Sequence, residues 1–171
     1  MASAALREGF MRRALALARQ SLELPGTLPY AAVVVQEGEI VGEGLNRSAA
    51  LHDPTSHGEI EAIRQACRRL GRIDLSGAEL YTTGEPCAMC VATMYLTGIA
   101  RLYYGGTGAD TAGFLGDLAT RQPIWRRPIG AADLRRQLSL PVGERAMPAE
   151  QLLAAEARAL LAEFACQHRA G

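Results

Sequence analysis

The chain has 171 residues, enough for one domain with a substantial hydrophobic core. Eighteen Lys and Arg balance eighteen Asp and Glu, so the sequence lacks the net positive charge that nucleic-acid-binding proteins usually carry. No apolar run is long enough to span a membrane. Two of the four cysteines form one C-x-x-C, which favours a metal site in a reducing cytosol over a disulfide framework.

The first third of the chain predicts a helix followed by a β-hairpin. From residue 6 to residue 18, apolar residues recur at three- and four-residue steps and form one face of a helix. Residues 30–35 are an apolar run of strand length, residues 37–39 form a turn, and residues 40–45 alternate weakly. These segments are expected to pair as antiparallel strands.

A second helix is expected to begin near residue 53. Residues 53–56 supply capping side chains and a proline, which is typical of a first helical turn. His57 and Glu59 would then lie in that first turn, and Gly71 would end the helix.

A strand–helix–strand unit follows. Residues 78–82 read as a short strand, Pro86 is expected to open a helix, and residues 101–104 form the next strand. Cys87 and Cys90 are three residues apart in the first turn of this helix, so both sulfurs face the same side. The crossover connection predicts that the two strands are parallel.

The pattern is weaker beyond residue 104. Residues 105–117 predict a glycine-rich loop, residues 131–138 a short helix, residues 141–148 an irregular segment or a short strand, and residues 151–168 a last helix. No repeat or low-complexity linker interrupts the chain. The prediction is therefore a single α/β domain over residues 1–171.

Three residues in this arrangement are typical zinc ligands. His57, Cys87 and Cys90 leave a tetrahedral ion with one open position, as in catalytic sites. A bound zinc ion lowers the pKa of its water toward neutrality, and Glu59 is placed to handle the protons of that water. Backbone N–H groups at the two helix starts would favour the thiolate forms of the cysteines.

The alternative is a structural zinc, which needs a fourth protein ligand. Cys67 fails this role because ten helical residues separate it from His57, a rise of about 15 Å. His52 and Cys166 remain open as fourth ligands. A structural site gives no role to Glu59, so the catalytic interpretation is favoured.

On these residues the chain resembles the cytidine-deaminase-like superfamily. The signature H-x-E…P-C-x-x-C is that of zinc-dependent base deaminases. Residues 28–33, 44–47, 53–59 and 85–90 follow the order of the branch that holds bacterial guanine deaminases and tRNA adenosine deaminases. Residues 143–148 are similar to the segment before the last helix of bacterial guanine deaminases. The resemblance implies a three-layer α/β/α fold with a central mixed five-stranded sheet, and a homodimer.

The resemblance also implies roles for individual residues. His57, Cys87 and Cys90 match the zinc ligands. Glu59 matches the proton shuttle, which moves a proton from the water to a ring nitrogen and then to the departing amine. Asn46 matches the residue that hydrogen-bonds the substrate base, although a turn residue at a strand end is the alternative.

Several departures from the family pattern concern the substrate. The family commonly has Ala at the position of Gly58, whereas yeast-type cytosine deaminases have Gly there, as this chain does. Ala31 stands where Gly is usual. Tyr30 and Phe114 are further candidate contacts to the base. Asp117 either supplies an acid that reads a purine, shifted from its place in guanine deaminases, or caps a helix.

The substrate is therefore expected to be a free nucleobase or a similar amino-heterocycle such as a triazine or pteridine. Guanine is the leading candidate, although the C-terminal aromatic residue of guanine deaminases is missing from residues 169–171. Gly58 supports a cytosine-like pyrimidine as the main rival. A neutral charge and a missing segment after the fourth strand disfavour tRNA and any other nucleic acid. A non-catalytic zinc-binding module is the alternative from another class, and Glu59 argues against it.

Overall fold

The computed structural model describes residues 3–125 and 128–167, which fall into two compact units, Met1–Ala131 and Ala132–Gly171. The first unit contains the sheet and every predicted site residue. None of the described helices is long and apolar enough to cross a membrane. The prediction of one domain over residues 1–171 stays a prediction.

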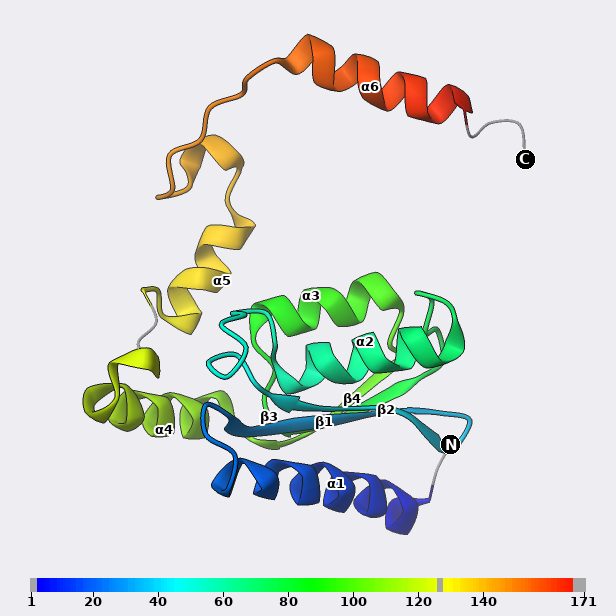
Figure 1. Ribbon diagram of the computed structural model, residues 1–171, viewed down its shortest axis with the longest axis vertical. Coiled ribbons are helices and arrows are strands. Elements are labelled where there is room, and N and C mark those ends of the chain that lie inside the picture. Colours follow the sequence, from blue (N-terminus) through cyan, green and yellow to red (C-terminus); the bar gives the residue numbers. More distant parts are fainter. Residues whose placement is uncertain (1–2, 126–127, 168–171) are drawn as a thin grey trace. The chain divides into compact units, whose positions relative to one another are not determined.

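The first unit is built on a mixed sheet (Figure 1). Its strands are β1 (Leu28–Gln36), β2 (Glu39–Asn46), β3 (Glu79–Gly84) and β4 (Arg101–Gly106), in the spatial order β2-β1-β3-β4. β1 is antiparallel to both β2 and β3, and β3 is parallel to β4, which confirms the predicted hairpin and crossover. The described sheet has four strands and not the five that the resemblance implies.

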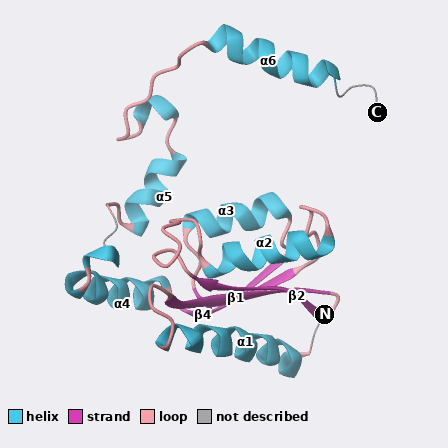
Figure 2. Cartoon of the chain, in the orientation of Figure 1, coloured by secondary structure: helices cyan, strands magenta, loops and turns pink. Residues whose placement is uncertain are grey.

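Helices cover both faces of this sheet, so the predicted α/β/α layering is confirmed (Figure 2). Helix α1 (Ala4–Arg19) lies on one face, and α2 (Gly58–Leu70) and α3 (Ala88–Thr97) lie on the other. Alternate residues of β1 enter the two cores: Val33 packs on the α1 side and Val34 on the α2 side. Burial on both faces explains why residues 30–35 are continuously apolar.

Both ligand-bearing helices begin later than predicted. Residues 53–56 form a turn and not a helical start, because Asp53 accepts hydrogen bonds from the Thr55 N–H at 2.8 Å and hydroxyl at 2.7 Å. His57 is the N-cap residue of α2, and Cys87 is the N-cap residue of α3. The ligands therefore stand at the helix entrances. The two helices end at the left-handed glycines Gly71 and Gly98.

The predicted loop over residues 105–117 is wrong. β4 continues to Gly106, and α4 (Gly108–Arg121) follows at once. Thr107 and Asp110 form a capping box in which each side chain bonds the other residue's backbone N–H. This cap satisfies the free N–H groups of the first turn and offsets the low helix propensity of the glycines in α4.

The second unit contains two helices beside short irregular segments. α5 (Ala131–Ser139) begins at the boundary of the first unit and confirms the helix predicted over residues 131–138. α6 (Ala154–Gln167) begins three residues later than predicted, and its predicted end at residue 168 lies outside the described residues, as do residues 169–171. Single turns of 3-10 helix occur at η1 (Gln20–Leu22), η2 (Pro123–Trp125) and η3 (Val142–Glu144).

Candidate active site

The structure brings His57, Cys87 and Cys90 together into one cluster. His57 Nδ1 lies 3.5 Å from the Sγ atom of Cys87 and 3.5 Å from that of Cys90, and the two sulfurs are 3.6 Å apart. Tetrahedral zinc with ordinary bond lengths would separate two sulfurs by about 3.8 Å and a sulfur from a nitrogen by about 3.5 Å. The three ligand atoms are therefore spaced as a zinc ion requires.

The N-terminal ends of two helices bring these residues together. α2 and α3 lie on the same face of the sheet, and their first residues follow the loop after β2 and the end of β3 (Figure 1). Within the described part of the chain, the metal-binding group consists of these three residues and no fourth His, Cys, Asp or Glu joins it. Among the described residues of the first unit, which include His52, the structural-zinc alternative therefore has no fourth ligand, and a fourth position is left for a water or a substrate.

The two thiols lie within hydrogen-bond distance of each other. The hydrogen bond between Cys87 and Cys90, together with the contact to His57, lowers the pKa of Cys87 to about 3 despite its burial. The hydrogen bond with Cys87, burial and the nearby charge of Glu59 raise the pKa of Cys90. A zinc ion would take the place of the remaining proton, because thiolates are the form that binds metal.

Glu59 is buried beside the cluster without being one of its ligands. Its side chain is buried, and the loss of solvent raises the pKa of its carboxyl, while its own backbone N–H and the charge of His57 oppose that shift. Its carboxyl interacts with the Cys90 thiol. A desolvated carboxyl with a raised pKa next to metal ligands is suited to exchanging protons near neutral pH. Glu61, two residues after Glu59 in α2, pairs instead with Arg64 at 2.6 Å.

Asn46 is buried at the end of β2, in the turn that leads toward α2. It is the last residue of β2 and is 1 % exposed. Its Oδ1 accepts hydrogen bonds from the Ser48 hydroxyl at 2.6 Å and N–H at 3.2 Å, so it is a turn residue as the alternative held. With Oδ1 used in this way, the amide hydrogens are what Asn46 can offer to a substrate. The Arg47 N–H donates to the Ser56 carbonyl at 3.0 Å and joins this turn to the chain before His57.

Gly58 has a packing role that the sequence does not reveal. A Cβ atom at Gly58 would lie 2.6 Å from the Tyr30 carbonyl oxygen and 2.8 Å from the Ala31 Cα. The N-terminal end of α2 thus packs directly on the backbone of β1. The absence of a side chain at Gly58 follows from this contact and needs no pyrimidine substrate to explain it.

Tyr30 and Phe114 lie together, and Asp117 lies elsewhere on α4. The rings of Tyr30 and Phe114 meet edge to face with centroids 6.2 Å apart. Asp117 is in the third turn of α4, where it pairs with Arg121 at 3.1 Å. The alternative that Asp117 caps a helix is wrong, because Thr107 and Asp110 form the cap of α4.

Two residues that the sequence analysis overlooked join the metal cluster to α4. Glu85, two residues before Cys87, accepts a hydrogen bond from the Gly108 N–H at 2.6 Å. Gly84 faces the Tyr30 ring, where an added Cβ would lie 3.0 Å from Cδ1. The position of Glu85 directly before the P-C-x-x-C segment is a signal that the sequence offers for it, whereas nothing in the pattern marks Gly84.

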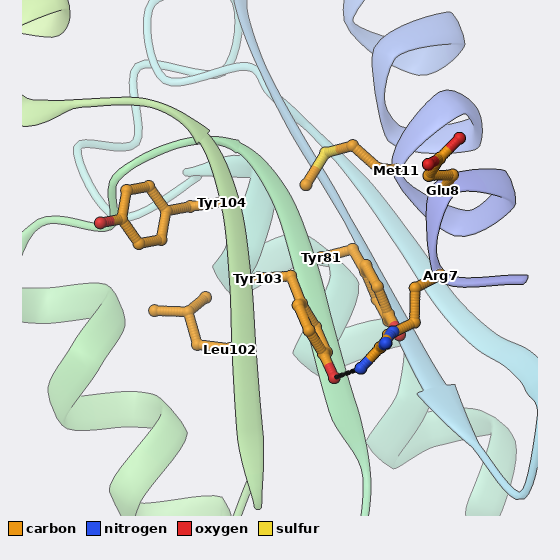
Figure 3. Close-up of a pocket in the computed structure, with 7 residues that line it drawn as sticks. All are labelled: Arg7, Glu8, Met11, Tyr81, Leu102, Tyr103 and Tyr104. Carbon is orange, nitrogen blue, oxygen red and sulfur yellow. Dashed lines mark hydrogen bonds between the residues drawn. The ribbon is translucent and has the colours of Figure 1, made fainter. Parts of the chain in front are cut away.

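A separate pocket of about 370 Å³ lies between α1 and β4 (Figure 3). The Tyr81 and Tyr103 rings stack there at 4.6 Å, and Arg7 donates to the Tyr103 hydroxyl at 3.4 Å. None of the predicted site residues lines this pocket; its lining consists of Arg7, Glu8, Met11, Tyr81, Leu102, Tyr103 and Tyr104.

Comparisons with known proteins converge on one family. Residues 5–106 match the zinc-binding region of cytidine and deoxycytidylate deaminases. Guanine deaminase of Bacillus subtilis is 38 % identical over 105 residues, which are 61 % of this chain and 67 % of that protein. A tRNA-specific adenosine deaminase of Agrobacterium fabrum is 46 % identical over 99 residues, 58 % of this chain and 64 % of that protein. The chain thus spans about two thirds of the length of these relatives.

The solved structures differ in how much of the chain they match. Guanine deaminase from Bacillus subtilis matches 96 % of this chain and 96 % of its own, with 28 % identity and a TM-score of 0.80. A structure from a study of tRNA:A34 deaminases matches 61 % of this chain and 79 % of its own, with 44 % identity and a TM-score of 0.57.

Proposed function

Since this chain belongs to the family of cytidine and deoxycytidylate deaminases, zinc-dependent hydrolases of C–N bonds, we propose that it deaminates a free nucleobase and that guanine is its substrate. One observation carries the choice of guanine. The likeness to guanine deaminase covers 96 % of this chain and therefore includes residues after the zinc-binding region, whereas the tRNA deaminase structure matches 61 %. Phe114 belongs to the part of the chain that follows the zinc-binding region.

The proposed roles follow from the geometry of the site. His57, Cys87 and Cys90 hold zinc, which supplies a water of lowered pKa when bound. Glu59 takes one proton from the attacking water and gives it to a ring nitrogen, then takes the second proton from the hydroxyl left on the ring and gives it to the departing amine. The amino group leaves as ammonia, and the water oxygen remains on the ring as a carbonyl.

The substrate contacts are proposed from the same positions. Asn46 donates its amide hydrogens to an acceptor on the base, because Oδ1 is held by Ser48. The rings of Tyr30 and Phe114 pack against the flat base. Gly58 supports these contacts indirectly, because it lets the N-terminal end of α2 pack against β1 beside Tyr30.

The assembly and setting are also part of the proposal. The enzyme works as a homodimer in the cytoplasm, as one domain over residues 1–171, with no membrane or nucleic-acid partner. The balanced charge supports the last point. Deamination of adenosine in tRNA is the second candidate, because the 46 % identity to the Agrobacterium enzyme favours it.

Ammonia release from a panel of free bases tests the proposal. Zinc-loaded protein is offered guanine, adenine, cytosine and an amino-triazine, and a tRNA substrate is assayed separately for inosine. We expect guanine to react fastest and inosine formation to be absent. Faster release from cytosine or the triazine, or inosine formation with salt-dependent tRNA binding, would replace guanine as the substrate. No ammonia from any base and no inosine would contradict the proposed activity.

A further inference from the structure

Helix α2 rests on the sheet at backbone distance where its first turn begins. A Cβ atom at Gly44 of β2 would lie 2.2 Å from the Gly58 carbonyl oxygen and 2.4 Å from the Ala62 nitrogen. A Cβ atom at Gly58 would meet the Tyr30 carbonyl oxygen of β1 at 2.6 Å. The nearest clashing atoms belong to the backbone, and the third atom at Gly44 is the Glu61 Cβ at 2.7 Å, so no flexible side-chain end can move aside to admit a methyl group.

The same helix is held laterally by two side chains. Gln65 Oε1 accepts a hydrogen bond from the Glu43 N–H at 2.6 Å, and Arg69 Nη1 donates to the Ile40 carbonyl at 2.8 Å. These bonds fix the later turns of α2 along β2. The height of its first turn above the sheet is set instead by the contacts of Gly44 and Gly58.

That height matters because Gly58 lies between His57 and Glu59. The three ligand atoms come from two helices, and His57 is the one contributed by α2. Lifting the α2 entrance from the sheet would move His57 Nδ1 away from sulfurs that now lie 3.5 Å from it. Metal–ligand bonds near 2 Å do not tolerate such a movement.

We propose that Gly44 and Gly58 are positioning residues for the zinc site, which fix the separation of His57 from the Cys87–Cys90 pair. They touch neither the metal nor a substrate and act through the backbone of the α2 entrance. The inference rests on the zinc-dependent chemistry of the family and does not depend on which base is deaminated.

Gly42 supplies a matched control. A Cβ atom at Gly42 would lie 2.1 Å from the Ala62 carbonyl oxygen and 2.8 Å from the Ala66 nitrogen. The clash is as severe as that at Gly44, but it falls one helical turn later, a rise of about 6 Å from Gly58. A role in packing alone would make Gly42→Ala and Gly44→Ala equivalent, whereas a positioning role separates them.

Zinc affinity measured by competition with a chromophoric chelator, and the absorption spectrum of the cobalt-substituted protein, test this role without any substrate. We expect Gly44→Ala to lower zinc affinity about 10-fold or more and to alter the cobalt spectrum. Gly42→Ala should lower the melting temperature by a similar amount while zinc affinity and spectrum stay near those of the parent protein. Equal zinc affinities in the two variants would overturn the proposal.

Gly58→Ala approaches the same entrance from the β1 side and serves if Gly44→Ala does not fold. Its clash at 2.6 Å is milder than that at Gly44, so a folded protein with reduced zinc affinity is expected. Gly113→Ala, with no atom within 4 Å of the added Cβ, is its control in another helix. Unchanged zinc affinity in folded Gly58→Ala would overturn the proposal. These measurements separate it from the guanine assignment, because ammonia release enters neither of them.

Discussion

The half of the site that holds the metal and the half that is expected to select the base are built differently. Cys90 is fully buried, and Glu59 is 5 % exposed. In contrast, none of the residues of α4 is buried, and Phe114 is 42 % exposed. The contacts that tie α4 to the metal half include one hydrogen bond, from Gly108 to Glu85, and one ring contact, between Phe114 and Tyr30.

This difference explains why the reaction type is easier to recognise than its substrate. The metal half needs ligand atoms at fixed separations, so few residue types at few spacings can form it. The half that is proposed to select the base includes an exposed helix, α4, whose residues can change with little effect on folding. Variants in the two halves should therefore differ in size of effect and in whether zinc is retained.

Removal of a ligand should have the largest effect. Cys87→Ser replaces a thiolate by a poor zinc ligand, so zinc content should fall from about one ion per chain to near zero and turnover should be lost. Metal analysis and ammonia release check this result. Cys67→Ser is the control, because that free thiol on α2 is outside the metal cluster. Loss of zinc from both variants would show that the cluster is not the zinc site.

Removal of the buried carboxyl should come next and should leave the metal in place. Glu59→Gln keeps the shape of the side chain and removes its proton transfer, so kcat should fall by about 10²- to 10⁴-fold with unchanged zinc content. Glu61→Gln changes a neighbouring carboxylate that pairs with Arg64, and it should keep nearly full activity. If Glu59→Gln retained full activity, the assigned proton path would be wrong.

Removal of Asn46, a proposed contact to the base, should have an intermediate effect. A lost hydrogen bond to the base costs about 1–3 kcal/mol, so Asn46→Ala should lower kcat/KM by about 5- to 150-fold with zinc retained. Ser48→Ala removes a partner of Oδ1 but keeps the amide hydrogens, and it should affect stability more than kcat/KM. Equal losses of kcat/KM in both variants would show that Asn46 stabilises the turn and does not contact the base.

The smallest effects are expected on α4. Hydrogen bonds from Thr107 lower the pKa of Asp110, so the folded state favours its ionised form. The resulting stability is present above the ordinary carboxyl pKa of about 4 and is lost as the pH falls through the lower folded value. Asp110→Ala should therefore lower the melting temperature at neutral pH, and the difference from the parent protein should disappear in acid.

Asp117→Ala is the comparison variant in the same helix. It breaks an exposed pair with Arg121, so melting temperature and kcat/KM should both change little. Thermal unfolding followed by circular dichroism and steady-state kinetics check the two variants. A loss of guanine turnover of 10-fold or more in Asp117→Ala would show that Asp117 contacts the base and that substitutions in α4 affect activity more than its exposure indicates.

The metal cluster could be predicted from the sequence because its ligands stand at two helix entrances marked by local signals. The exact starts of those helices could not, since Asp53 uses its side chain to stabilise a turn where a helical start was expected. α4 was mistaken for a loop because three glycines lower helix propensity, whereas the capping box acts through two side chains that propensity does not weigh.

Gly58 shows a different limit of sequence reasoning. Its departure from the family pattern suggested a change of substrate, but the structure gives it a contact with the β1 backbone. Such a contact joins residues nearly thirty positions apart and leaves no trace in periodicity or composition. The same holds for Gly84, which faces the Tyr30 ring.

The two edges of the sheet have different consequences for association with other chains. Gln65 and Arg69 bond the backbone of β2, while β4 pairs with β3 and has no second strand partner among the described residues. An unpaired strand edge is a template for another strand, and growth into a fibre needs two such edges on every molecule. With the β2 edge bonded by Gln65 and Arg69, β4 is the edge of the described sheet that is left open to a further strand. The side chains that hold the later turns of α2 along β2 therefore also cover part of the β2 edge of the sheet.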